Sequence, residues 1–152
     1  MFNSNNSDIS YLSRSDTHHP LASYASNSFE LDGGQWPTVE HYYQAMKFTD
    51  TALREQIRCT ENPLSAVKLA DKNKRHIRND WKKIKRTIMT RGLYIMFRTH
   101  TAATQLLLAS GNNKLVEKSQ YDYYWGCGRD LRGENIYGEI LMEIREKLKE
   151  NP

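Results

Sequence analysis

The chain has 152 residues, 38% hydrophobic and 26% charged, with 22 basic against 18 acidic residues. These values are typical of one soluble globular domain that buries a core. No apolar run is long enough to span a bilayer and no signal peptide is evident, so we expect a cytoplasmic protein without a membrane partner. Two cysteines make neither a disulfide framework nor a four-ligand zinc site. The net charge of +4 is compatible with phosphate-bearing ligands but does not by itself indicate nucleic acid.

The first half of the chain carries strand signals followed by helix signals. Thr38 is a typical N-cap residue, and Asn62-Pro63 is a typical helix start because proline is tolerated at the first helical position. Asp32-Gly33-Gly34 favours a turn that returns the chain through Gln35-Trp36. The expected elements are a flexible N-terminus over 1–8, strands at 9–13 and 28–31, and helices over 39–48, from Asp50 or Thr51 to about 58, and over 62–69.

The second half is mainly helical, with one long loop. Asp80 and Asn135 stand where they would cap helices, and the residues after Asn135 repeat apolar side chains at helical spacing. We expect helices near 81–98, over 102–109 and from 136 to about 148, an extended stretch at 115–117, and a loop over 120–134. The predicted fold is α+β and predominantly α-helical, with a small N-terminal β element, in one domain over 9–149.

The predicted helix over 39–48 carries the first candidate site. At about 100° per residue, Glu40, Gln44 and Lys47 share one narrow arc, with Tyr43 at its edge and apolar residues on either side. A carboxylate and an amine flanked by residues that favour burial are suited to chemistry, because burial and pairing shift pKa values. The alternative is ordinary: Glu40 complements the helix dipole, and Lys47 reaches from an apolar surface to solvent.

The second candidate is the loop over 120–134. It combines a carboxylate at Asp122, a stacking surface at Trp125 and a glycine at Gly126 that lets a ligand approach the backbone, just before a helix start at Asn135. The alternative is a packed Ω-loop in which Trp125 forms its own small core.

A basic run forms a third, weaker signal. We interpret most of it as a solvated helix face and keep Arg78, near Trp81, as a phosphate contact. The run comprises Lys72, Lys74, Arg75, Arg78, Lys82, Lys83, Lys85 and Arg86.

Five separated motifs together resemble the NADAR (YbiA-like) N-glycosidases, in one order and over about residues 9–148. They are Trp36-Pro37-Thr38-x-Glu40-His41-Tyr42, Gln44-Ala45-x-Lys47-Phe48, Leu115-Val116-Glu117, Asp122-x-x-Trp125-Gly126, and Asn135-x-x-Gly138 with Leu141-Met142-x-x-Arg145.

The resemblance implies hydrolysis of an N-glycosidic bond between a ribose and a base or amine, without a metal or cofactor. Two substrate classes are associated with the family: phosphoribosylamino-pyrimidine intermediates of riboflavin biosynthesis, and ADP-ribosylated guanine in a nucleoside or nucleic acid. The resemblance makes Glu40 and Lys47 the catalytic pair. It makes these residues the substrate-binding set: Gln44, Arg78, Trp81, Asp122, Trp125, Gly126 and Asn135.

The resemblance implies a mechanism in which Lys47 is the nucleophile and forms a Schiff base with the opened sugar, while Glu40 shuttles the proton. Direct attack by water assisted by Glu40 is the alternative mechanism. The alternative function is a non-catalytic module that binds ADP-ribose or nucleic acid. The sequence does not give the oligomeric state.

The chain departs from the family pattern at several positions. Ser23-Tyr24 stands where Asn-Phe is common, Ala70-Asp71 replaces a frequent Gly-Arg, and Met96 stands where lysine is usual. Cys127 occupies a variable loop position. These departures affect the expected phosphate and ribose contacts but not the catalytic pair.

Overall fold

The computed structural model describes residues 8–152, which form six α-helices, one short 3-10 helix and four short strands. The expected flexible segment over 1–8 therefore lies outside the described residues, except for Asp8. The fold is α+β and predominantly α-helical, as predicted. It comprises two compact units, one of residues 23–100 and one of residues up to 22 together with 101–152. No helix within 8–152 has the length and apolar character that a membrane crossing requires.

The unit over 23–100 begins with a hairpin. Strands β2 (Phe29–Leu31) and β3 (Gly34–Trp36) pair antiparallel, with Phe29 opposite Trp36. Asp32 and Gly33 have φ of 53° and 75°, and positive φ at both central residues is the geometry of the tight turn that Asp-Gly favours. The sequence predicted this hairpin.

Helix α1 (Val39–Ala45) starts as predicted but ends earlier. Thr38 is its N-cap and accepts a hydrogen bond from the His41 N–H. The predicted end at Phe48 is wrong, because Met46 and Lys47 form a turn and Phe48 lies beyond it, outside the helix. The N–H groups of Lys47 and Phe48 bind the carbonyls three residues back, Gln44 and Ala45, at 3.3 and 3.2 Å. Tertiary partners hold this turn: Arg78 N–H donates to the Lys47 carbonyl at 2.8 Å, and Arg54 Nε donates to the Phe48 carbonyl at 2.6 Å.

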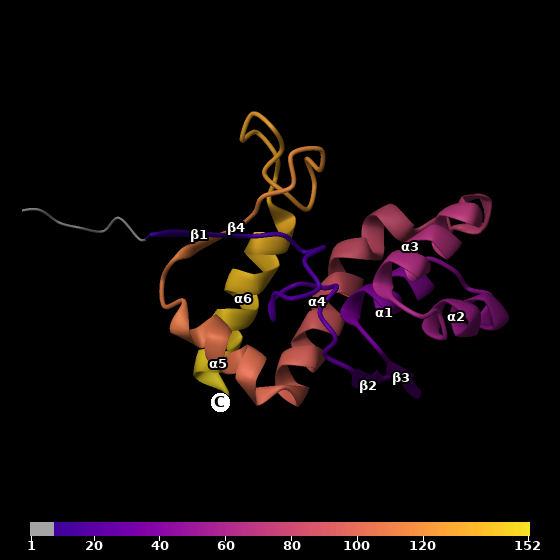
Figure 1. Ribbon diagram of the computed structural model, residues 1–152, viewed down its shortest axis with the longest axis horizontal. Coiled ribbons are helices and arrows are strands. Elements are labelled where there is room, and N and C mark those ends of the chain that lie inside the picture. The colour runs from indigo at the N-terminus through magenta and orange to yellow at the C-terminus, as the bar shows by residue number, and fades with distance from the viewer. Residues whose placement is uncertain (1–7) are drawn as a thin grey trace, which may run out of the picture. The chain divides into compact units, whose positions relative to one another are not determined.

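Three further helices pack against α1 (Figure 1). Helix α2 (Thr51–Arg58) is capped by Asp50, one of the two residues predicted to start it, and α3 (Pro63–Lys72) is capped by Asn62, as predicted. The 3-10 helix η1 (Lys74–His76) then leads to the longest helix, α4 (Trp81–Thr99). Asp80 precedes α4 but makes no side-chain cap, since its carboxylate pairs with Arg78.

A glycine brings α4 close to α1. A Cβ atom at Gly92 would lie 3.0 Å from a ring carbon of Tyr42 and 3.2 Å from Val39. Tyr42 is fully buried, with its ring 5.3 Å from Trp36 and 6.2 Å from Phe29. This aromatic cluster fixes one side of α1, so that its polar residues are held in a defined orientation.

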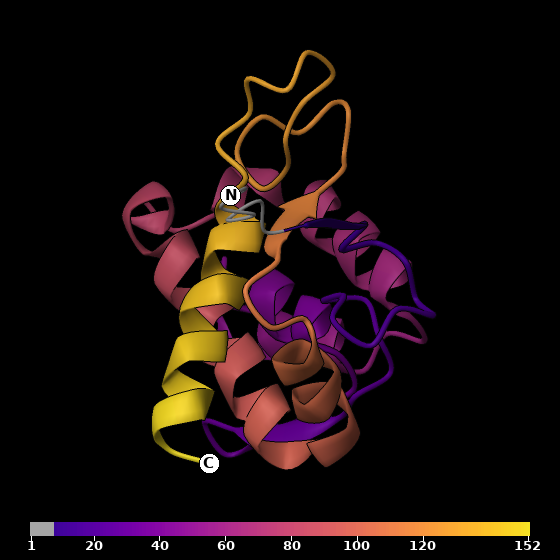
Figure 2. The same ribbon diagram turned by 90° about the vertical axis from the view of Figure 1, so that its left-hand side faces the viewer.

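The second unit joins the beginning and the end of the chain. Strands β1 (Ile9–Leu12) and β4 (Lys114–Glu117) pair in parallel, and the sequence did not predict this pairing. Helix α5 (Thr101–Ala109) packs against α6 (Ile136–Glu150), whose predicted apolar stripe is buried. A loop over 118–135 connects β4 to α6 and lies at the N-terminal end of that helix (Figure 2).

Candidate active site

Glu40 is a fully buried carboxylate held by two donors. Ser23 Oγ donates to Glu40 Oε2 at 2.8 Å, and Gln44 Nε2 donates to Oε1 at 2.8 Å. The Ser23 backbone carbonyl also accepts from the Glu40 N–H at 2.9 Å. A buried carboxylate is costly unless it is hydrogen-bonded, so these contacts fix its position. Sequence reasoning noticed Ser23 only as a departure from the family pattern and missed this contact.

Gln44 lies one helical turn after Glu40 and is 3% exposed. Its Nε2 is engaged with Glu40, whereas its Oε1 is buried without a hydrogen-bond partner among the described residues. A buried acceptor that is left unpaired costs about 1–3 kcal/mol.

Lys47, Tyr43 and Trp81 come together beside the end of α1. Lys47 is half-buried, with its Nζ 5.5 Å from the centre of the Tyr43 ring. The Tyr43 and Trp81 rings lie 5.0 Å apart at 53°. The prediction that Lys47 shares one helical arc with Glu40 is wrong, because α1 ends at Ala45. The turn nevertheless places the amine against an aromatic surface, where a cation is stabilised.

Arg78 reaches this cluster through its backbone. Its N–H binds the Lys47 carbonyl, but its guanidinium pairs with Asp80 at 2.7 Å. A substrate phosphate would have to compete with the Asp80 carboxylate for the Arg78 guanidinium. Arg78 therefore positions the turn at Lys47, and its expected phosphate contact stays a prediction.

His41 supports the same helix from within the core. Its Nε2 lies 3.1 Å from the Thr60 carbonyl, which only accepts, so Nε2 carries the proton and Nδ1 accepts from the Thr38 hydroxyl at 2.8 Å. Burial lowers the pKa of His41, although the Thr60 carbonyl and Glu40 oppose the shift. The imidazole is thus held neutral in this arrangement.

The other candidate residues lie in the loop over 118–135. Asp122 Oδ1 accepts from the backbone N–H groups of Tyr124 and Trp125 at 3.0 and 2.7 Å, which shapes the turn. Trp125 is 5% exposed, and the Arg14 guanidinium lies 5.8 Å from its ring. The indole is therefore packed in its own unit, and its expected stacking on a substrate is untested.

A second buried carboxylate organises this loop, and sequence reasoning did not select it. Glu117 Oε1 accepts from the Arg14 N–H at 3.1 Å and from Ser119 Oγ at 2.6 Å, and Oε2 accepts from the Ser119 N–H. A side chain at Gly126 would collide with the Glu117 carboxylate and with two backbone carbonyls. Packing alone therefore requires glycine at position 126.

Asn135 does not cap α6 through its side chain, so this part of the prediction is wrong. Its backbone is left-handed, with φ of 52°, and both ends of its amide bind β4. Oδ1 accepts from the Glu117 N–H at 2.8 Å, and Nδ2 donates to the Leu115 carbonyl at 2.9 Å. The structure gives this side chain a positioning task, which leaves it little capacity for a substrate contact.

The remaining departures from the family pattern have ordinary environments. Ala70 is 1% exposed in α3, and Asp71 beside it faces solvent. Met96 is buried in α4, and its sulfur lies 3.7 Å from Asn27 Nδ2. Cys127 is buried in the loop, with its thiol against the Gly128 carbonyl.

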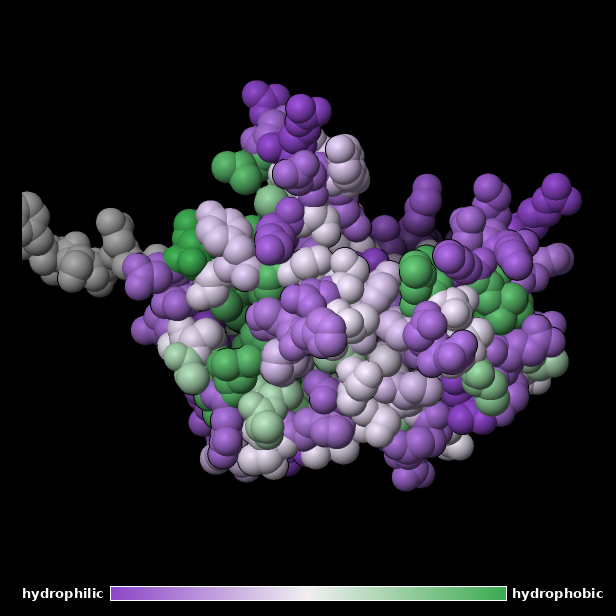
Figure 3. Space-filling view, in the orientation of Figure 1, coloured by the Kyte–Doolittle hydropathy of each residue, from purple (hydrophilic) through white to green (hydrophobic). Residues whose placement is uncertain are grey.

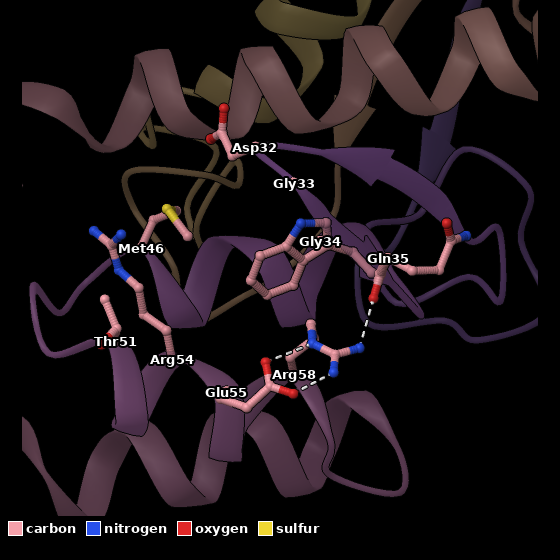
Figure 4. Close-up of a pocket in the computed structure, with 10 residues that line it drawn as sticks. Asp32, Gly33, Gly34, Gln35, Met46, Thr51, Arg54, Glu55 and Arg58 are labelled. Atoms are coloured by element: carbon pink, nitrogen blue, oxygen red, sulfur yellow. Dashed lines mark hydrogen bonds and ion pairs between the residues drawn. The ribbon is translucent and has the colours of Figure 1, made fainter.

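A cavity of about 390 Å³ opens beside the hairpin, lined by Gly33, Gln35, Met46, Arg54, Glu55 and Arg58 (Figure 4). Neither Glu40 nor Lys47 lines it. The Arg58 guanidinium lies between Glu55 and the Gln35 carbonyl, and both partners occupy its donors. The cavity is therefore separate from the candidate catalytic pair.

A family model described as the NADAR domain matches residues 1–149. The chain belongs to the NADAR family. This NADAR chain is 38% identical over 140 residues to "N-glycosidase YbiA" of Escherichia coli, covering 92% of this chain and 88% of that protein. It is 36% identical to a "Riboflavin biosynthesis protein" of Vibrio vulnificus, covering 94% of this chain and 39% of the longer relative.

An experimental structure supports the same relationship. The NMR structure of the E. coli protein YbiA superposes with a TM-score of 0.84 at 37% identity, covering 94% of this chain and 86% of that chain. The NADAR fold is thus shared as well as the sequence pattern.

Proposed function

We propose that this NADAR protein is an N-glycosidase that hydrolyses a ribosyl C–N bond, with Lys47 as nucleophile and Glu40 as acid and base. The observation that carries the proposal is the buried Glu40 carboxylate, which Ser23 and Gln44 hold in one orientation on α1. Its relatives named as N-glycosidases make this reaction class the natural one.

The chemistry follows from the charge that develops during cleavage. After Lys47 gives its proton to Glu40, the amine attacks the anomeric carbon, the C–N bond breaks, and its electron pair leaves with the base, which takes that proton from Glu40. The ribose ring then opens as its oxygen takes a proton, giving a Schiff base on Lys47. Water adds to this imine and releases the sugar and the free amine. A fixed carboxylate also stabilises positive charge on the sugar.

Turnover and trapping test these roles together. We expect Lys47→Ala and Glu40→Gln to lower kcat by about 10²–10⁴-fold, because each removes a group that takes part in bond breaking. Borohydride added during turnover should leave a sugar adduct on Lys47, detectable by mass spectrometry. Lys68→Ala and Glu30→Gln, at exposed positions, are the matched controls.

The alternatives give different results. If Lys47→Ala keeps near-normal turnover and no adduct forms, water is the nucleophile and the Lys47 assignment is wrong. If the wild-type protein binds the substrates but turns over neither, the binding-module function is correct instead.

Two substrate classes fit this proposal: the phosphoribosylamino-pyrimidine and ADP-ribosylated guanine. Both carry phosphate, and one residue of the basic run over 72–86, Arg78, binds the Lys47 carbonyl through its backbone N–H. Separate incubations, read by mass spectrometry, show which substrate releases its sugar. An ADP-ribosylated oligonucleotide whose turnover falls steeply with salt would favour the nucleic-acid form.

A further inference from the structure

The unpartnered carbonyl of Gln44 is the feature that the proposed mechanism leaves unused. Its amide cannot be turned over to satisfy it, because the carbonyl oxygen would then face the Glu40 carboxylate, where Nε2 now donates at 2.8 Å. The orientation of Oε1 is therefore dictated by Glu40. A group that is 3% exposed, fixed and unsatisfied is a ready acceptor for a donor brought by a ligand.

Bond lengths limit where that donor lies. The oxygen and nitrogen of an amide are about 2.2 Å apart, given C=O and C–N bonds of about 1.23 and 1.33 Å. Since Nε2 is 2.8 Å from Glu40 Oε1, Gln44 Oε1 is at most about 5 Å from that oxygen. A donor bound to Gln44 is thus close to Glu40, which in the proposed function stabilises positive charge on the sugar. Of the donors on a ribosyl group, the 2-hydroxyl is on the carbon adjacent to that centre.

We propose that Gln44 Oε1 accepts a hydrogen bond from the 2-hydroxyl of the substrate ribose and makes the site selective for ribosyl over 2-deoxyribosyl groups. This inference rests on the proposed function. It names Gln44 Oε1 as the atom that contacts the substrate, and the ribose 2-hydroxyl as the group that this atom recognises. A site built to bind a hydroxyl discriminates strongly against the analogue without it, because the buried acceptor is then left unpaired.

The Ser23 contact strengthens this assignment. Ser23 Oγ donates to Glu40 Oε2, and Gln44 Nε2 donates to the other oxygen of the same carboxylate, Oε1. The serine, the carboxylate and the amide therefore form one chain of hydrogen bonds that ends at the Gln44 carbonyl. Such preorganisation lets the hydroxyl bind without rearrangement of the site.

Substrate pairs test the proposal. We expect wild-type kcat/KM to favour a ribosyl substrate over its 2-deoxy analogue, and Gln44→Met to lower kcat/KM for the ribosyl substrate by about 10–100-fold. The same variant also removes the Nε2 donor to Glu40, so turnover of the 2-deoxy analogue should fall as well, but by less than turnover of the ribosyl substrate, and the discrimination between the two sugars should collapse. Gln56→Met, at an exposed position on α2, is the matched control.

Product binding gives a second measurement that does not depend on turnover. Calorimetry should show that the wild-type protein prefers ribose 5-phosphate to 2-deoxyribose 5-phosphate, and that Gln44→Met binds both equally. Gln44→Ala serves as a second variant if the methionine variant does not fold.

Three results would overturn the proposal. One is an equal loss of turnover on both sugars in Gln44→Met. Another is a product preference that survives the substitution. The third is a loss that instead follows methylation of an amine on the base, which would place the base at Gln44. Absence of wild-type turnover would contradict the proposed function, while the calorimetric comparison of the two sugar phosphates would still decide the role of Gln44.

Discussion

Ser23, a residue with a short side chain, holds the Glu40 carboxylate in place. Ser23 is fully buried and contacts Glu40 through both its hydroxyl and its backbone carbonyl. The family pattern commonly has asparagine here, and a serine hydroxyl supplies the donor to the carboxylate from a smaller volume. Ser23 is therefore a positioning residue in this interpretation, since it acts on the substrate only through Glu40.

We expect Ser23→Ala to lower kcat by about 10-fold or more while changing KM little, because it removes one charge-assisted hydrogen bond from Glu40. Steady-state kinetics across pH should show the acid limb of the rate profile moving to higher pH. Ser23→Thr keeps the hydroxyl and should restore the rate, and Ser26→Ala, at an exposed position, is the control. Equal loss in the alanine and threonine variants would indicate a purely structural role.

Among the elements, the loop over 118–135 depends on a clamp formed by Asn135. Replacing Asn135 with alanine leaves the Glu117 N–H and the Leu115 carbonyl without their partners and places alanine at a φ of 52°. We expect Asn135→Ala to lower the free energy of unfolding by about 2–4 kcal/mol in urea denaturation. Asn112→Ala, at an exposed position, should change it by less than about 0.5 kcal/mol. A similarly small effect of Asn135→Ala would contradict the clamp.

The same loop shows what local signals in a sequence can predict. Thr38, Asp50 and Asn62 were identified as caps because capping depends on neighbouring residues only. Asn135 carries the same signal, yet its amide binds β4, which is about 20 residues away in sequence. The turn after Ala45 also depends on distant residues, since Arg54 and Arg78 bind the Phe48 and Lys47 carbonyls. Contacts between residues far apart in the sequence produce no periodic pattern in it, and the sequence therefore did not predict the pairing of β1 with β4.

Across the whole molecule, charge is distributed unevenly. Residues 72–86 hold eight of the 22 basic and one of the 18 acidic residues, so this segment is +7 and the remainder of the chain is −3. Many of these side chains are exposed on η1 and the first turns of α4, and Figure 3 shows hydrophilic side chains projecting above α3. Although the net charge of the chain is small, residues 72–86 produce a positive local potential that attracts phosphate groups.

The stability of the whole fold should also depend on pH near neutrality. Burial lowers the pKa of both His41 and His19 below 6.5, so the unfolded chain binds these protons more readily than the folded protein does. The two neutral imidazoles contribute fully to the free energy of unfolding above pH 6.5. This contribution is lost as the pH falls through their pKa values in the folded protein. Glu55 and Asp80 pair with arginines that lower their pKa values, so protonation of these carboxylates affects stability only in more acidic solution.

We therefore expect the free energy of unfolding to fall between pH 7 and pH 5, with a slope of at most about 1.4 kcal/mol per pH unit for each histidine. Urea denaturation at closely spaced pH values would measure it. His41→Gln should flatten the slope, because glutamine has no proton to gain, whereas His76→Gln, at an exposed position, should leave it unchanged. A slope that is the same in His41→Gln and wild type would show that the neutral imidazole of His41 contributes nothing to this pH dependence.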